Sequence, residues 1–132
     1  MSLTERLAGI ACDAGYIAVA DGEWVSFNVE GTTYRFETFE NDAAYARLIV
    51  GFSIPCDVSL ERLLAAANEQ NRKTKSVKTV VYPLSKDGHV SFSIETFFSD
   101  AKVWEPTFDR ALAALRVASD EFYGSLKTAD VA

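Results

Sequence analysis

The sequence contains few of the residues that build catalytic and metal-binding sites. Its 132 residues include one histidine, His89, and two cysteines, Cys12 and Cys56, which lack CxxC spacing. P-loop, GxGxxG, GxSxG and HExxH motifs are also missing. A metal would need at least two further good ligands beside His89, and a catalytic histidine would need a nucleophile or carboxylate partner. We therefore expect no enzyme, no metal site and no cofactor.

Long apolar runs are missing as well. No stretch approaches the roughly 20 apolar residues of a membrane span, and the chain does not begin with a basic segment followed by an apolar one. These absences favour a cytoplasmic protein. Cys12 and Cys56 lie in apolar stretches, which predicts small buried thiols, with a disulfide or a reactive thiol as the less favoured alternative.

Positive charge is scarce: 13 Lys and Arg face 19 Asp and Glu, which gives a net charge of −6 at pH 7. Because nucleic-acid-binding proteins normally carry a basic surface, a nucleic acid is not expected as a partner. Apolar residues make up 48% of the chain and charged residues 24%, which is the balance of a folded protein rather than a disordered one. Residues 1–132 are therefore expected to form a single domain.

The first part of the chain predicts a helix followed by a hairpin. Ser2 and Glu5 have the spacing of a capping box, and apolar residues follow at helical spacing up to Gly15. Residues 25–29 and 34–36 alternate between apolar and polar side chains. This alternation is typical of a hairpin with one face toward solvent.

A buried strand and a second helix are predicted next. Segment 44–54 is apolar on both faces except for Arg47, which is typical of a central strand covered on two sides, and Pro55 should end it. Ser59 is a suitable N-cap for a helix that runs to about Lys73. The expected buried stripe of this helix consists of four residues: Leu60, Leu63, Leu64 and Ala67.

The last third of the chain predicts a hairpin and a long helix. Strands at 77–81 and 90–98 flank an Asp87-Gly88 turn, and Pro106 suits the first turn of a helix that continues to about Leu126. The resulting order, αβββαββα, predicts an α+β fold. In this fold the strands form one antiparallel sheet and the helices pack mainly on one of its faces.

The sequence between Ser59 and Leu126 resembles the YbjN family, a family of proposed bacterial sensory-transduction regulators. The residues that carry the resemblance are 63–72 (LLAAANEQNR), 77–80 (VKTV), the Asp87-Gly88 turn and the Phe122-Tyr123 pair. The family is similar in fold to type III secretion chaperones. The resemblance implies a chaperone-like fold and self-association, and it brings no catalytic residues.

Three aromatic residues are candidates for a partner-binding surface. Phe98 shares a strand face with apolar residues, whereas Phe97 belongs to the opposite, polar face. An aromatic residue on a polar face suggests a protein partner, and so we assign Phe97, Trp104 and Trp24 to this surface. For Phe97 and Trp104, local cover of the core is an equally weighted alternative.

Two asparagines near the end of the second helix are candidate polar anchors. Asn68 and Asn71 continue the stripe of Leu60 and Leu64, so a helix would point them toward the sheet. The favoured interpretation is that they bind neighbouring backbone, because buried amides must be hydrogen-bonded. A ligand contact is the alternative.

The only basic cluster of the chain follows these asparagines and consists of Arg72, Lys73, Lys75 and Lys78. Cations at a helix C-terminus are stabilised by the helix dipole, which favours a solvated cluster. Docking of an acidic partner is the alternative.

The leading functional hypothesis is a non-enzymatic, chaperone-like module that binds a protein partner and forms a homodimer. It would capture an extended segment at an exposed apolar patch or a sheet edge. The first alternative is a small-molecule regulator with a pocket between helices and sheet, lined by Tyr16, Tyr45 and Phe52, with Asn71 as its polar anchor.

The second alternative is an enzyme whose scattered carboxylates converge in the fold. Asp13, Asp21 and Glu95 are the candidates for such a site. No motif supports this alternative.

Overall fold

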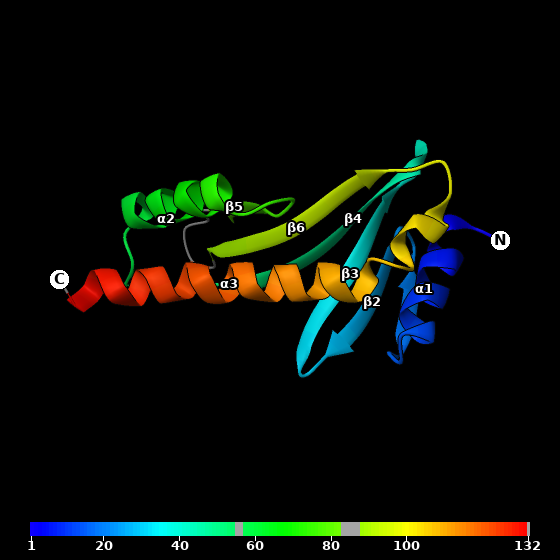
Figure 1. Cartoon of the computed structure of the whole chain (residues 1–132), viewed down its shortest axis with the longest axis horizontal. Helices are drawn as coiled ribbons and strands as arrows, with labels where there is room; N and C mark the ends of the chain where they lie inside the picture. Colours follow the sequence, from blue (N-terminus) through cyan, green and yellow to red (C-terminus); the bar gives the residue numbers. More distant parts are fainter. Residues whose placement is uncertain (55–56, 83–87, 132) are drawn as a thin grey trace.

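The computed structural model describes residues 1–54, 57–82 and 88–131. Three residues with a predicted role lie outside this range: Pro55 as the end of a strand, Cys56 as a buried thiol and Asp87 in a hairpin turn. The elements are, in chain order, α1 (Leu3–Asp13), β1 (Ala18–Asp21), β2 (Trp24–Val29), β3 (Thr32–Phe39), β4 (Asp42–Ser53), α2 (Leu60–Lys73), β5 (Lys78–Tyr82), β6 (His89–Phe97), the 3-10 helix η1 (Ala101–Trp104) and α3 (Phe108–Val131) (Figure 1).

Serine caps begin the first two helices as the sequence predicts. The Ser2 hydroxyl accepts a hydrogen bond from the Glu5 amide at 3.2 Å, and the Ser59 hydroxyl accepts one from the Arg62 amide at 3.2 Å. Pro106 does not lie in the first turn of α3, contrary to expectation. The helix begins at Phe108, because η1 and a short turn occupy the preceding residues.

The described strands form one antiparallel sheet in the order β1-β2-β3-β4-β6-β5. β4 lies in the interior of the sheet, where it pairs with β3 on one side and β6 on the other. The sequence did not predict β1, an edge strand of four residues that pairs with β2. The predicted α+β class, the single antiparallel sheet and the packing of helices mainly on one face are confirmed.

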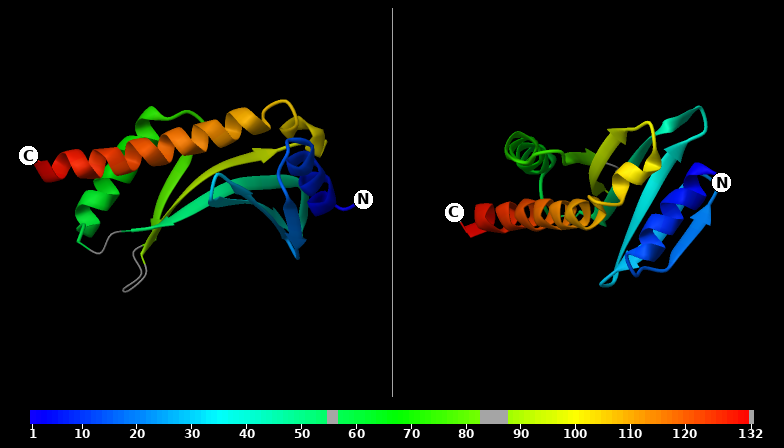
Figure 2. Two further views of the ribbon diagram at one scale, coloured as in Figure 1. Left: turned by 90° about the horizontal axis from the view of Figure 1, so that it is seen from below. Right: turned by 45° about the vertical axis from the view of Figure 1, so that its right-hand side comes forward.

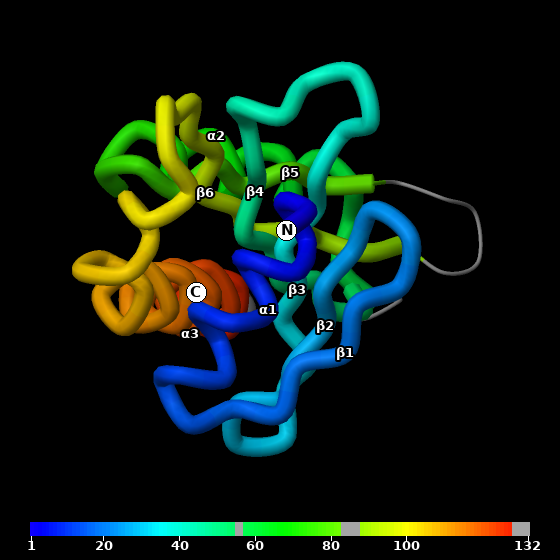
Figure 3. The backbone as a smooth tube through the Cα atoms, turned by 90° about the vertical axis from the view of Figure 1, so that its right-hand side faces the viewer, coloured from blue at the N-terminus to red at the C-terminus, as the bar shows by residue number. Residues whose placement is uncertain are grey.

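The helices cover one face of this sheet, and the core lies between the two layers. Phe36, Leu48 and Phe92 point to this side from three neighbouring strands and are fully buried. Figure 2 shows α3 crossing the sheet on one side only, and Figure 3, which looks nearly along α3, shows the helix on one side of the strands. The opposite face carries no helix among the described residues, and we call it the open face.

The structure corrects two predictions about burial. β4 was expected to be covered on two sides, but its second face belongs to the open face, where Tyr45 and Arg47 are only partly buried and Gly51 is exposed. Cys12 is exposed rather than buried, because the buried face of α1 consists of Leu7, Ile10 and Ala11.

α2 buries a narrower stripe than the sequence predicts. Its buried residues are Leu63, Ala67 and Gln70, which contact β5 and α3, whereas Leu60 and Leu64 are exposed by 45% and 50%. The expectation that Leu60 and Leu64 belong to the core is wrong. α2 packs beside α3 at the β5 edge of the sheet, so only one side of the helix meets other elements (Figure 1).

Candidate protein-binding surface

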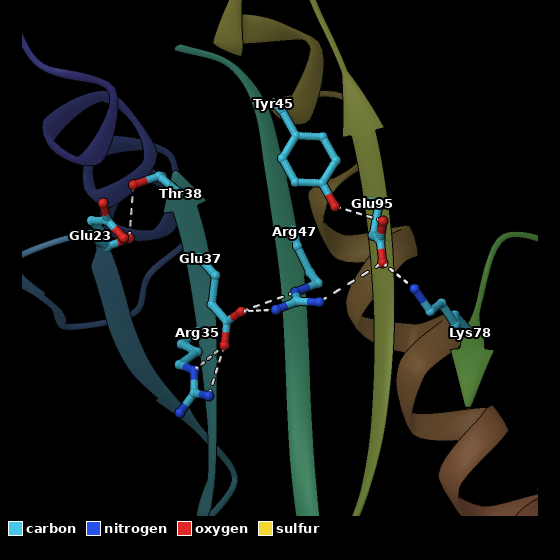
Figure 4. A network of polar contacts seen from close by, with 8 residues as sticks. All are labelled: Glu23, Arg35, Glu37, Thr38, Tyr45, Arg47, Lys78 and Glu95. Carbon is cyan, nitrogen blue, oxygen red and sulfur yellow. Dashed lines mark hydrogen bonds and ion pairs between the residues drawn. The ribbon is translucent and has the colours of Figure 1, made fainter. Parts of the chain in front are cut away.

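Ion pairs cross the open face from β3 to β5 (Figure 4). The Glu37 carboxylate accepts hydrogen bonds from Arg35 Nε at 2.8 Å and from Arg47 Nε at 3.0 Å. The strand register places Arg47 opposite both Glu37 and Glu95, and Glu95 accepts a bond from Lys78 Nζ at 2.9 Å. These pairs give the centre of the open face a fixed polar surface.

Tyr45 joins the aromatic end of the open face to these charges. Its hydroxyl donates to Glu95 Oε2 at 2.6 Å. Burial, followed by this hydrogen bond, raises the pKa of Tyr45 to about 12. The hydrogen bond from Lys78, with a further one from Tyr45, holds the pKa of Glu95 below its ordinary value of 4.5.

The lowered pKa of Glu95 predicts a pH-dependent effect of Glu95→Gln. Since the folded-state pKa is depressed, ionised Glu95 stabilises the fold fully above pH 4.5, and this stabilisation is lost as the pH falls through the folded-state pKa. We expect the variant to be less stable at pH 7 by no more than about 1 kcal/mol, because the network is partly solvent-exposed. Urea unfolding at pH 7 and pH 3 should show the two proteins converging at the lower pH. An equal gap at both pH values would contradict the role of the ionised carboxylate.

Three aromatic rings lie in contact at one end of the open face, and we call them the aromatic platform: Phe39, Tyr45 and Phe97. The ring centroids of Phe39 and Tyr45 are 5.4 Å apart, and those of Tyr45 and Phe97 are 5.1 Å apart. Phe97 is 78% exposed and Phe39 is 38% exposed. Together with Asn41, Asp42 and Glu95 the platform lines a hollow of 620 Å³. Contiguous exposed aromatic area of this kind is typical of protein-binding surfaces.

Three further carboxylates lie beside this platform, at the neighbouring turns. Glu23, in the β1–β2 turn, accepts a hydrogen bond from the Glu40 amide at 3.0 Å, and Asp42 accepts one from the Ala44 amide at 3.0 Å. Glu23, Phe39, Glu40 and Asn41 line a second hollow of 400 Å³ next to the first. Glu23, Glu40 and Asp42 make no ion pair within the described part of the chain.

The two tryptophans occupy different environments. Trp24 lies on the open face, where it is 47% exposed and the Arg35 guanidinium stacks 4.3 Å from its ring centroid. Trp104 is 2% exposed and packs edge-to-face on Phe36, with centroids 5.2 Å apart. Trp104 therefore covers the core, and its assignment to an exposed partner-binding patch is wrong.

Phe97, by contrast, lies on the exposed side of its strand, as the alternation of the sequence predicts.

The two asparagines of α2 also lie in different environments. The Asn71 amide donates to the Thr79 carbonyl at 3.0 Å and accepts from the Thr79 amide at 2.7 Å, so it pairs with the backbone of edge strand β5. This is the backbone contact that the favoured interpretation predicts. Asn68 is exposed and does not face the sheet, because the stripe of Leu60 and Leu64 points to solvent.

The basic cluster is largely compensated by the chain's own carboxylates. Arg72 pairs with Glu69 at 2.6 Å, Lys73 with Glu121 at 3.1 Å, and Lys78 with Glu95 at 2.9 Å. The remaining member, Lys75, makes no ion pair with any described residue. Docking of an acidic partner here would have to compete with these pairs.

The residues proposed for a small-molecule pocket divide between the two sides of the sheet. Tyr16 and Phe52 line a hollow of 380 Å³ between the sheet and α3, together with Tyr34. Tyr45 lies on the open face, and Asn71 is engaged by β5. Only two of the four residues are therefore brought together.

The structure also separates two of the three candidate carboxylates of an enzyme site. Asp13 ends α1, on the helix-covered side, whereas Glu95 lies on the open face. The described residues hold no cluster of three or more His, Cys, Asp or Glu side chains suited to a metal ion. None of their helices is long and apolar enough to cross a membrane.

An open antiparallel sheet with helices on one face defines this chain as an α+β protein. Its structure is similar to that of YbjN, a proposed transcription regulator from E. coli, with a TM-score of 0.71, 8% identity, and coverage of 87% of this chain and 86% of that one. It is also similar to a chain in the HopA1–SchA chaperone–effector complex, with a TM-score of 0.60, 15% identity, and coverage of 95% and 94%.

A third similar structure is that of an uncharacterized protein from Methanothermobacter thermautotrophicus. The TM-score is 0.64 at 10% identity, and the match covers 94% of this chain and 99% of that chain. No family model and no curated protein sequence matches the chain. At these identities the similarities establish the fold alone.

Proposed function

We propose that this chain is a non-enzymatic, chaperone-like module that acts in the cytoplasm and binds a segment of a protein partner on its aromatic platform. The observation that carries the proposal is Phe97, a large apolar side chain that is 78% exposed and in ring contact with Tyr45 on a helix-free sheet face. Exposure of an aromatic ring has a cost in water that binding a partner removes.

The shape of the surface supports an extended segment as the bound form. The aromatic platform lies on the open face at the end of β6, beside the β3–β4 turn, so a chain could run across it without displacing a helix. The similarity of the fold to a chain in a chaperone–effector complex supports a protein as the partner. The net charge of −6 and the internally paired basic cluster favour a protein over a nucleic acid as partner.

Self-association uses a different surface, on α2. Leu60 and Leu64 lie one turn apart on α2 and are half exposed, and an uncharged apolar pair can meet its own copy across a twofold axis. The aromatic platform is less suited to self-pairing, because Glu23, Glu40 and Asp42 would approach the same carboxylates of a second copy. A homodimer formed through α2 would leave the platform free.

Photo-crosslinking from the platform tests the proposal. With benzoylphenylalanine in place of Phe97, we expect a discrete crosslink to one segment of a protein partner in cells that produce the chain. Val117 on α3 is 52% exposed and provides the control position for an apolar side chain elsewhere on the surface. The same products from both positions, or none from position 97, would argue against a partner site on the platform.

A small-molecule regulator is the second candidate function. It is supported by the hollow of 380 Å³ between the sheet and α3, a volume within the range of ligand pockets, which Arg116 and Glu30 border with an ion pair of 2.8 Å. In an NMR screen of metabolites, changes in the signals of Tyr16 and Tyr34 when a compound is added would favour this function. No such change with any fraction of a cell extract would count against it.

A further inference from the structure

The aromatic platform and its charges form a surface of mixed character. Three rings provide apolar and π surface, and Glu23, Glu40 and Asp42 lie at its border without ion-pair partners among the described residues. Elsewhere on the open face the carboxylates of Glu37 and Glu95 are neutralised by arginine and lysine. Uncompensated negative charge on this face is therefore concentrated beside the platform.

We propose that the segment bound on the aromatic platform is cationic, with a lysine or arginine next to an apolar side chain. This inference rests on the proposed function and adds the chemistry of the partner. The apolar side chain contacts Phe97, and the neighbouring cation lies over a ring while its charge faces Glu40 and Asp42.

Ring faces and carboxylates favour the same ligand charge for different physical reasons. The negative face of an aromatic ring attracts a cation, and the attraction grows when both are partly desolvated. The Arg47 guanidinium already lies 5.7 Å from the Phe39 ring centroid, which shows that this ring accepts a cation from within the chain. Carboxylates at the border add attraction over a distance of about 8–10 Å at moderate salt and repel an acidic segment.

The geometry of the carboxylates allows their charge to be removed without their hydrogen bonds. Gln at position 23 can still accept from the Glu40 amide, and Asn at position 42 can still accept from the Ala44 amide. Glu40 makes no side-chain hydrogen bond among the described residues. The triple variant Glu23→Gln, Glu40→Gln, Asp42→Asn therefore tests charge separately from shape.

Selection from a displayed library of random twelve-residue peptides tests the inference. Peptides retained by the wild-type protein and not by Phe97→Ser are sequenced. We expect them to be enriched in Lys and Arg beside aromatic or aliphatic residues. The best of them should bind the triple variant at least about tenfold more weakly, with an affinity that falls as salt is raised. The control variant Asp13→Asn, Glu61→Gln, Glu105→Gln removes the same charge elsewhere and should bind like the wild type.

The outcomes separate this inference from the proposed function. Phe97-dependent peptides that are neutral or acidic would overturn the cationic partner and leave the protein-binding platform standing. Equal weakening by the triple variant and its control would also overturn it, because the effect would then follow net charge. A selection that yields no Phe97-dependent peptide would contradict both.

Discussion

Replacing Trp104 by alanine is expected to lower the free energy of unfolding by about 3–5 kcal/mol. The side chain is 2% exposed and packs from η1 onto Phe36 of the sheet, and Phe36 itself contacts Phe108 at a centroid distance of 5.6 Å. Truncation would leave a cavity where α1, η1 and the sheet meet. Urea unfolding followed by circular dichroism measures the loss.

Two companion variants make this prediction specific. Trp104→Phe keeps a ring and removes an indole N–H that has no hydrogen-bond partner among the described residues, so its cost should stay below about 1.5 kcal/mol. Phe97→Ser should change stability by less than about 0.5 kcal/mol, because most of its ring already faces solvent. Similar losses for Trp104→Ala and Phe97→Ser would mean that the two aromatics do not differ in burial as described.

Asn71→Ala is expected to destabilise the protein by about 1–2 kcal/mol and to increase its tendency to aggregate. The change removes both hydrogen bonds to Thr79 and uncovers the backbone of β5, which is an edge of the sheet. An uncovered edge can pair with another chain. Urea unfolding gives the first effect, and light scattering on heating gives the second.

Asn68→Ala is the matched control for this edge. Asn68 lies on the same helix, is exposed, and its side chain makes no hydrogen bond with the described residues. Its replacement should be neutral or slightly stabilising, since alanine has the higher helix propensity. If both variants behave alike, Asn71 does not protect the sheet edge.

The fold class could be predicted because its signals are local. Serine caps, alternating strands and the spacing of apolar residues in α3 each depend on neighbouring positions, and they determined the element order. β1 could not be found in the same way. It has four residues, with only Ala18 partly buried, so no alternating pattern marks it, and it is a strand because β2 offers a pairing edge.

The buried side of α2 is decided by tertiary contacts, which the spacing of apolar residues in the sequence does not reveal. Leu60, Leu63, Leu64 and Ala67 fit one apolar stripe, but α2 lies at the side of the sheet and meets β5 and α3 along a single line. Gln70 therefore replaces Leu64 among the buried residues. Cys12 was misassigned for a related reason, since its apolar neighbours face the core and it does not.

The sequence predicted only part of the candidate surface. Alternation along residues 90–98 separates Phe97 from Phe98, and that local signal predicted Phe97 on the polar face of the sheet, which is the open face. Phe39 and Tyr45 were missed, and Tyr45 was assigned to the helix side of the sheet. Their place beside Phe97 depends on the register across β3, β4 and β6, including an irregularity at Thr38, which composition and spacing do not reveal.

The solution mass measured by light scattering tests the central claim that self-association leaves the aromatic platform free for a different protein. The 14.5 kDa chain should form a dimer, and Phe97→Ser should leave that dimer intact, whereas Leu60→Ser with Leu64→Ser should give a monomer. A dimer that Phe97→Ser dissociates and the leucine variant does not would contradict the account, because the platform would then be the contact between two copies.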